Sequence, residues 1–331
     1  MRLSRKQKIW LNYVLGSLLF VFIAVSIYQQ VQGQKNLAGQ LVLIKQQLQH
    51  HTVWVVLASL VLMLCNWGIE ALKWQRLASQ MGPLSYGQAV KSVVAGVAFT
   101  MLTPNRMGEY LGRMLYFKEG SRVRAATLTL VGSLSQLIVT LFAGIVGLAA
   151  LKWSMAAAPT PHPAFSVLLF NVLMWGTAML LTIGALFYFN LHWVIAALEK
   201  IPRIAKYAYF IHLIGQISHV ELLRLLLLSG LRYVVFLLQY LLFFSVFGVE
   251  ASFAQLLAGT AVMFLMLAAI PTIALAELGI RGKASLFIFG FFSSNVLGIL
   301  AATAGVWMIN IILPAIAGSL LLLGIKLYDK S

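Results

Sequence analysis

Long apolar stretches alternate with short polar links along the whole chain. The longer stretches hold about 20 apolar residues, the length at which an α-helix crosses the hydrocarbon core of a bilayer. The pattern predicts an all-α protein: a polytopic transmembrane helical bundle of seven to nine membrane segments, forming a single transmembrane domain over residues 1–331. The expected apolar runs are Ile9–Tyr28, Thr52–Leu72, Gln88–Thr103, Ala126–Leu151, Phe165–Phe189, Leu222–Val249, Phe253–Ile270, Ala284–Val296 and Leu297–Leu323.

Two of these runs are too short for an ordinary span. Gln88–Thr103 lies between basic links that are both expected on the same side of the membrane. Ala284–Val296 has to join the two sides, yet at about 1.5 Å per residue it covers only about two thirds of the hydrocarbon core. We therefore expect broken or re-entrant elements over residues 88–117 and 270–296.

Composition excludes a folded soluble domain of any size. Hydrophobic residues make up 61% of the chain and charged residues 10%, whereas soluble domains are about 25% charged. Cys65 is the one cysteine, so no internal disulfide or cysteine metal cluster is expected. The sequence has no phosphate-binding GxxxxGK[ST], no HExxH and no GxSxG motif. We expect no cofactor, no metal, no ATPase of its own and no catalytic residue, which favours a protein that is not an enzyme.

Charge orients the predicted spans. Lys and Arg number 24 against 8 acidic residues, a net charge of +16, and most of them lie in the short links. Positive links face the cytoplasm, which predicts cytoplasmic termini, a basic N-terminal segment 1–8 and a cytoplasmic amphipathic link over residues 191–221. The same reasoning argues against nucleic acid as a partner. The first run is expected to be an uncleaved span, because it is longer than the apolar region of a signal peptide.

Two segments share an unusual order of residues. They are TPNRMGEYLGR, Thr103–Arg113, and IPTIALAELGIRGK, Ile270–Lys283. In each, a proline is followed by a glutamate and, four residues later, by an arginine, with glycines nearby. This order indicates an internal repeat of the kind that marks binding sites in transporters. The motif positions are Pro104, Gly108, Glu109, Gly112 and Arg113 in the first segment and Pro271, Glu277, Gly279, Arg281 and Gly282 in the second.

The residue types in these segments suit an anionic ligand. Thr103 can cap a helix and Pro104 fits its first position, which would place a positive helix end inside the membrane. Glutamate and arginine four residues apart lie on one helical face and can neutralise each other. Gly108 and Gly112 form a GxxxG that permits close helix packing. The alternative is that the ion pairs are purely structural.

Arg232 lies about ten residues into its run, near the middle of the bilayer. Its expected partner is Glu109, Glu277 or a lipid phosphate, because an unpaired mid-bilayer arginine is costly. Glu70 and Lys73 are expected to form an interfacial pair, with Trp67 and Trp74 as interface anchors. The candidate substrate-binding residues are Arg106, Glu109, Arg113, Arg232, Glu277 and Arg281.

The sequence also resembles a known family. TPNRMGEYLGRMLYF is similar to the Pro-Gly-x-x-Gly-Glu-x-x-Arg signature of the membrane region of lysylphosphatidylglycerol synthases and their stand-alone, flippase-like relatives. EALKWQRLASQMG, ALEKIP and AELGIRG add to the resemblance, which extends over about Trp54 to Leu323. Asn105 stands where the family usually has glycine, and Arg113 follows Glu109 by four residues where the family has three.

The resemblance implies a lipid translocase or lipid-binding transporter in the bacterial inner membrane, with membrane lipids as its partners. Because the chain ends at Ser331, no aminoacyl-transferase domain is expected. One alternative is a membrane subunit or scaffold of an envelope lipid-synthesis complex, either as a homo-oligomer or with a partner. Another is a membrane-embedded enzyme that modifies lipid headgroups.

Overall fold

The computed structural model describes residues 25, 28–29, 37–100, 103, 107–117, 121–156, 167–193, 215, 217–270 and 274–323. Every regular element in these ranges is a helix, so the all-α prediction is confirmed. The basic segment 1–8, nearly all of the first run and most of the link 191–221 lie outside the described residues. Pro104, Arg106 and Pro271 lie outside them as well.

Five helical stretches in the described part of the chain are long and apolar enough to cross a membrane. They are Val53–Met81, Arg122–Ser154, Val167–Phe189, His219–Val246 and Val296–Leu321, and Phe253–Ala269 is a shorter apolar helix. The protein is therefore an integral membrane helical bundle by length and composition. The expected total of seven to nine segments stays a prediction.

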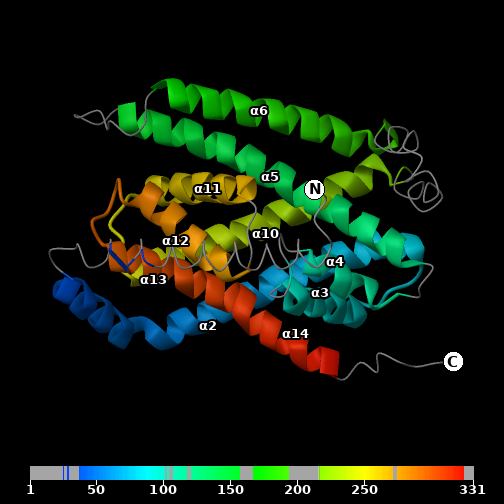
Figure 1. The fold of residues 1–331 in the computed structure, drawn as a ribbon, viewed down its shortest axis with the longest axis horizontal. Helices are drawn as coiled ribbons and strands as arrows, with labels where there is room; N and C mark the ends of the chain where they lie inside the picture. Colours follow the sequence, from blue (N-terminus) through cyan, green and yellow to red (C-terminus); the bar gives the residue numbers. More distant parts are fainter. Residues whose placement is uncertain are drawn as a thin grey trace, which may run out of the picture.

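The long helices form most of the bundle in Figure 1. They are α2 (Leu37–Ala78), α5 (Arg122–Ala156), α6 (Val167–Phe189), α10 (His219–Val246) and α13 (Val296–Trp307), the last continuing through the π-helical turn η4 (Met308–Ile312) into α14 (Leu313–Leu323). A 3-10 turn, η1 (Ser79–Met81), follows α2 directly. Helix α6 lies along the edge of the bundle beside α5 (Figure 1).

Four short helices form two consecutive pairs. They are α3 (Tyr86–Thr100) with α4 (Gly108–Met114), and α11 (Phe253–Ala269) with α12 (Ala274–Phe289). The two pairs lie toward opposite ends of the bundle in Figure 1. The expected run Ala284–Val296 has different bounds in the structure, because α12 begins ten residues earlier and α13 begins at Val296. The charged motif belongs to α12, since its Glu277 and Arg281 pair with each other on one helical face.

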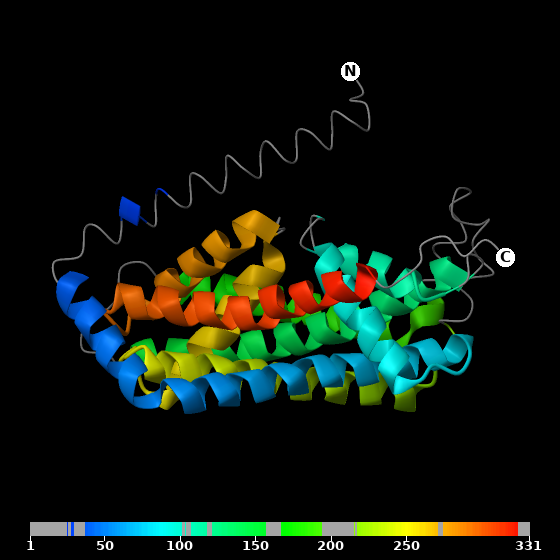
Figure 2. The same ribbon diagram turned by 90° about the horizontal axis from the view of Figure 1, so that it is seen from below.

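Helices α2 and α10 run in opposite directions, as Figure 2 shows. The side-chain hydrogen bonds between the two helices agree with these opposite directions. Gln239 donates to the Ser59 carbonyl, Arg232 to Asn66, and Lys73 to Ser229. Residue numbers rise along α2 as they fall along α10. The two helices form the antiparallel centre of the molecule.

The helices that follow α2 and α10 begin in the same way. Gly82 and Gly248 are the two glycines with positive φ among the described residues, and each precedes a short helix. Ser85 with Gln88 starts α3, and Ser252 with Gln255 starts α11. In both pairs the serine hydroxyl accepts from the glutamine backbone N–H while the glutamine side chain accepts from the serine N–H. Pro104 and Pro271 stand the same number of residues after Ser85 and Ser252.

Two of the short helices, α11 and α3, each pack against a helix that is distant in the sequence, α5 and α14 respectively. A Cβ at Gly147 of α5 would meet the Ala258 carbonyl of α11 at 2.9 Å, and one at Gly318 of α14 would overlap the Val94 carbonyl of α3. These glycines let the backbones approach closely. Two apolar cores result, one around Trp74 and Leu225 and the other around Phe244 and Phe289.

Candidate functional site

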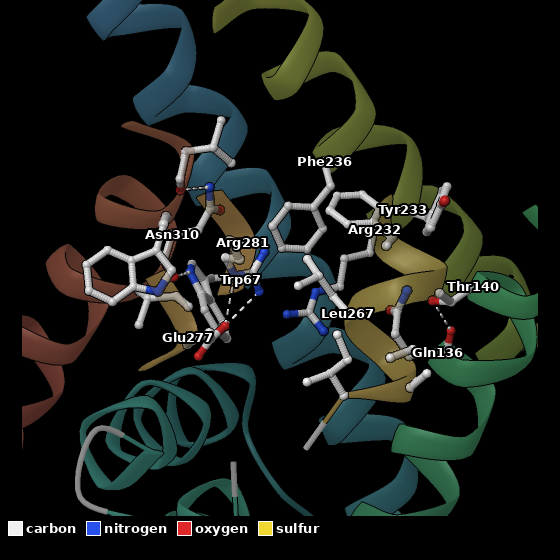
Figure 3. A pocket seen from close by; sticks show the side chains of 17 residues that line it. Trp67, Gln136, Thr140, Arg232, Tyr233, Phe236, Leu267, Glu277, Arg281 and Asn310 are labelled. Atoms are coloured by element: carbon white, nitrogen blue, oxygen red, sulfur yellow. Dashed lines mark hydrogen bonds and ion pairs between the residues drawn. The ribbon is translucent and has the colours of Figure 1, made fainter. Parts of the chain in front are cut away.

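A cavity of about 530 Å³ lies among α2, α5, α10, α11, α12, α13 and η4. Its charged lining residues in the described ranges are Arg232 of α10 and Glu277 and Arg281 of α12. Aromatic rings contribute much of its wall, among them Trp67, Phe236, Phe264 and Trp307. In the view of Figure 3 the Glu277–Arg281 pair lies on one side of Arg232, and Gln136 and Thr140 lie on the other.

Glu277 and Arg281 form a close ion pair in the cavity wall. Nε and Nη2 of Arg281 both donate to Oε1 of Glu277, at 3.0 and 2.7 Å. Both side chains are largely shielded from solvent. The spacing of four residues places them on one face of α12, as the sequence indicated. Gly279 and Gly282 are buried in the same helix.

Arg232 occupies the middle of α10, about 20 Å along the helix from its first residue. Its Nε donates to Oδ1 of Asn66 at 2.7 Å and its Nη1 to Oε2 of Glu70 at 2.8 Å. The guanidinium also lies over the rings of Trp67 and Phe236, at 5.2 and 5.6 Å from their centroids. The expectation that Glu109 or Glu277 would pair with Arg232 is wrong, because Glu70 does so.

Glu70 is the centre of a buried charge cluster. Its carboxylate contacts Lys73 at 2.9 Å, Arg113 at 2.5 Å and Arg232 at 2.8 Å. Glu70, Lys73 and Arg113 are each 3% exposed or less. The expected interfacial pair is therefore a core pair, because α2 continues past Leu72 to Ala78 and carries both residues inside the bundle.

Trp67 and Trp74 are buried too, so their expected role as interface anchors is wrong. Trp74 lies under the guanidinium of Arg113, with 5.0 Å between the guanidinium carbon and the ring centroid. Trp67 donates from Nε1 to the Asn310 carbonyl at 3.2 Å. Both indoles thus pack against buried cations of the site through cation–π contacts.

Helix α4 carries Glu109 and Arg113 and packs tightly on α3. Arg113 lies 3.8 Å from Glu109, farther than from Glu70. A Cβ at Gly108 would overlap the Phe99 backbone, and one at Gly112 would overlap the Gly96 backbone. Helix α4 begins at Gly108, later than the Pro104 start expected from the sequence. The Thr103 hydroxyl accepts from the Gly108 N–H at 2.6 Å.

A chain of amides extends the polar contacts along α2. Asn66 donates to Asn310, Asn310 donates to Gln239, and Gln239 donates to the Ser59 carbonyl. Gln239 and Asn310 thus form hydrogen bonds between helices. Asn66 and Glu70 were missed as members of the site. The sequence feature that could have indicated them is the spacing of polar residues, one every three or four positions within an otherwise apolar helix.

The structure therefore gathers three of the candidate residues, Arg232, Glu277 and Arg281, around one cavity. Arg113 joins them indirectly, because Glu70 bridges Arg113 and Arg232. Glu109 lies beside Arg113 with a side chain that is 21% exposed. Within the described ranges no group of three or more His, Cys, Asp or Glu side chains could hold a metal ion.

Comparison with known protein families gives a match over most of the chain. The family model described as the lysylphosphatidylglycerol synthase TM region matches residues 9–321, nearly the whole chain. No curated protein and no solved structure matches the chain.

Proposed function

Because the chain belongs to the lysylphosphatidylglycerol synthase TM region family, we propose that it binds a membrane lipid by an anionic or zwitterionic headgroup and moves it across the bacterial inner membrane. The family relates the chain to lipid handling, and the buried charges suggest which part of the lipid it holds. Its termini are proposed to be cytoplasmic, on the charge pattern of the links.

The observation that carries this proposal is the position of positive charge in the cavity. Arg232 and Arg281 outnumber Glu277 among the described lining residues, leaving one surplus positive charge inside the membrane domain. A lipid phosphate supplies one negative charge and accepts hydrogen bonds from guanidinium groups. The aromatic and aliphatic walls, including Leu267 and Ile270, suit the apolar part of the same ligand.

The arrangement of the helices supports a transporter. Helices α2 to α5 and α10 to α14 follow the same order: a long helix, a positive-φ glycine, a serine–glutamine box, two short helices and a long return. Since α2 and α10 are antiparallel, we propose that the two sets form an inverted repeat. Inverted repeats with broken helices place substrate sites near the membrane midplane. We propose that residues 88–117 and 270–296 are the two re-entrant elements of this repeat.

Transport of a fluorescent-headgroup phospholipid in proteoliposomes tests the proposal. We expect Arg281→Gln to reduce the translocation rate by roughly tenfold or more, because loss of a charge-assisted bond costs about 1.5–3 kcal/mol. Arg224→Gln is the matched control: Arg224 belongs to α10, pairs with Glu221 and is largely exposed. The control should translocate at the wild-type rate.

A result in which wild-type protein moves no lipid above empty liposomes, for anionic and zwitterionic headgroups alike, would contradict the transporter. The role as a membrane subunit would then be the better proposal. Lipid mass spectrometry of a deletion strain distinguishes a headgroup-modifying enzyme from a translocator. A missing or new lipid species indicates headgroup modification, whereas deletion of a translocator leaves the lipid species unchanged.

A further inference from the structure

Three side chains that line the cavity carry a buried polar atom without a hydrogen-bond partner among the described residues. The atoms are Oε1 of Gln136, the hydroxyl of Tyr233 and Nε1 of Trp307. Tyr233 is 5% exposed, so bulk solvent does not satisfy its hydroxyl. Buried polar groups in native proteins are almost always hydrogen-bonded. A molecule bound in the cavity can supply the missing partners of these atoms.

The three atoms belong to uncharged groups and include both hydrogen-bond donors and acceptors. The Gln136 oxygen accepts a hydrogen bond, the Trp307 nitrogen donates one, and the Tyr233 hydroxyl does either. Thr140, which also lines the cavity, adds a further hydroxyl, whose proton goes to the Gln136 backbone carbonyl. Hydroxyl groups of a ligand complement such a set because each of them both donates and accepts.

The carboxylates nearby are already engaged by cations of the protein. Glu277, the carboxylate of the described lining, accepts two bonds from Arg281. Glu70, behind Arg232, contacts three cations. A ligand ammonium group in the cavity would thus meet two guanidinium groups with their acids committed. Like charges inside one cavity repel each other strongly in a medium of low dielectric constant.

We propose that the cavity selects a lipid phosphodiester whose headgroup is uncharged and hydroxyl-bearing, a glycerol or sugar, over one that carries an ammonium group. This inference rests on the proposed function, since it specifies the headgroup of the same lipid. The phosphate neutralises the surplus charge of Arg232 and Arg281. The hydroxyls bond to Gln136, Tyr233 and Trp307. The cavity volume of about 530 Å³ is within the range of small-molecule sites and is larger than a bare phosphate group requires.

Native mass spectrometry of the purified protein with defined lipids tests the headgroup selection. Phosphatidylglycerol, phosphatidylethanolamine and lysylphosphatidylglycerol are offered at equal concentration. We expect phosphatidylglycerol to be retained roughly tenfold more strongly than lysylphosphatidylglycerol, with phosphatidylethanolamine between them. Equal retention, or preference for either ammonium-bearing lipid, overturns the inference while leaving a lipid-binding protein. If none of the lipids is retained, the proposed function fails as well.

A water-soluble probe separates the lipid from its headgroup. Glycerophosphoglycerol has the same phosphodiester and hydroxyls as phosphatidylglycerol but no acyl chains. We expect it to bind at least roughly tenfold more weakly, since the apolar wall around Leu267 and Ile270 then has no partner. Equal binding of the soluble probe would show that the ligand is a free phosphodiester and would overturn the lipid part of the inference.

Two variants test the charge and the hydroxyl contacts separately. Thr140→Asp adds a carboxylate to the cavity, so the preference for phosphatidylglycerol over lysylphosphatidylglycerol should shrink by roughly threefold or more. Thr127→Asp, on α5 but outside the cavity lining, should leave the preference unchanged. Gln136→Leu should weaken phosphatidylglycerol binding by roughly fivefold, whereas Leu137→Ala, at an exposed neighbouring position, should not. An unchanged preference in Thr140→Asp, or unchanged binding in Gln136→Leu, contradicts the inference.

Discussion

Replacing Glu70 with glutamine is expected to lower the free energy of unfolding by about 3–5 kcal/mol, the cost of removing one partner from a buried ion pair. The side chain keeps its shape but loses its charge. Lys73, Arg113 and Arg232 would then remain buried next to one another without the carboxylate that each contacts within 2.9 Å. Mutual repulsion and lost charge-assisted bonds act in the same direction. The contacts join α2, α4 and α10, so their loss weakens the centre of the bundle.

Thermal or denaturant unfolding in one detergent measures this effect. Glu250→Gln is the matched control, because Glu250 is exposed in the link between α10 and α11, and it should change stability by less than about 0.5 kcal/mol. Adding Lys73→Met to Glu70→Gln removes one of the stranded cations and should recover part of the loss. If Glu70→Gln is as stable as the control, the carboxylate does not hold the cluster together.

Replacing Gly112 with alanine is expected to destabilise the protein by about 3 kcal/mol, although alanine is the better helix former. The added Cβ would overlap backbone atoms of Gly96 and Ala95, which cannot rotate away as a side chain could. Helices α3 and α4 would have to separate. Arg113, the next residue on α4, would move with its helix away from Glu70, so packing and ion pairing are lost together.

Gly176→Ala distinguishes this steric effect from helix propensity. Gly176 lies on the exposed helix α6, and a Cβ there would meet nothing within 4 Å. This control should be neutral or up to about 1 kcal/mol more stable. The two substitutions are therefore expected to differ by about 3 kcal/mol or more in the same unfolding measurement. A neutral Gly112→Ala would mean that α3 and α4 are not packed as closely as the structure shows.

Several features of the protein follow from local sequence. Apolar runs locate the long helices because a bilayer requires each span to satisfy its own backbone hydrogen bonds, so helix and apolar length coincide. Expected Phe165–Phe189 and observed Val167–Phe189 agree in this way. The Glu277–Arg281 pair was also predictable, because four residues bring two side chains to one helical face regardless of what surrounds them.

Prediction from the sequence failed where polar residues were taken to end a span. The apolar run ends near Leu72, yet α2 continues to Ala78 and carries Glu70 and Lys73 into the core. Burial of Glu70 depends on Arg113 and Arg232, which lie 43 and 162 residues further along the chain. The periodicity of apolar residues contains no information about which distant cations lie beside a given carboxylate in the folded chain. The same applies to the cavity, which exists only because α2, α5, α10, α11, α12, α13 and η4 meet.

Local sequence was enough to predict a membrane-embedded helical protein with two charged segments of similar residue order, since apolar length and residue spacing along one helix are local properties. Only the folded bundle places Glu70 beside Arg113 and Arg232, and brings Arg232, Glu277 and Arg281 to one cavity. The physical reason is the cost of charge at low dielectric constant. A buried ion is tolerated only beside its partner, and the partner's position is set by how the helices pack.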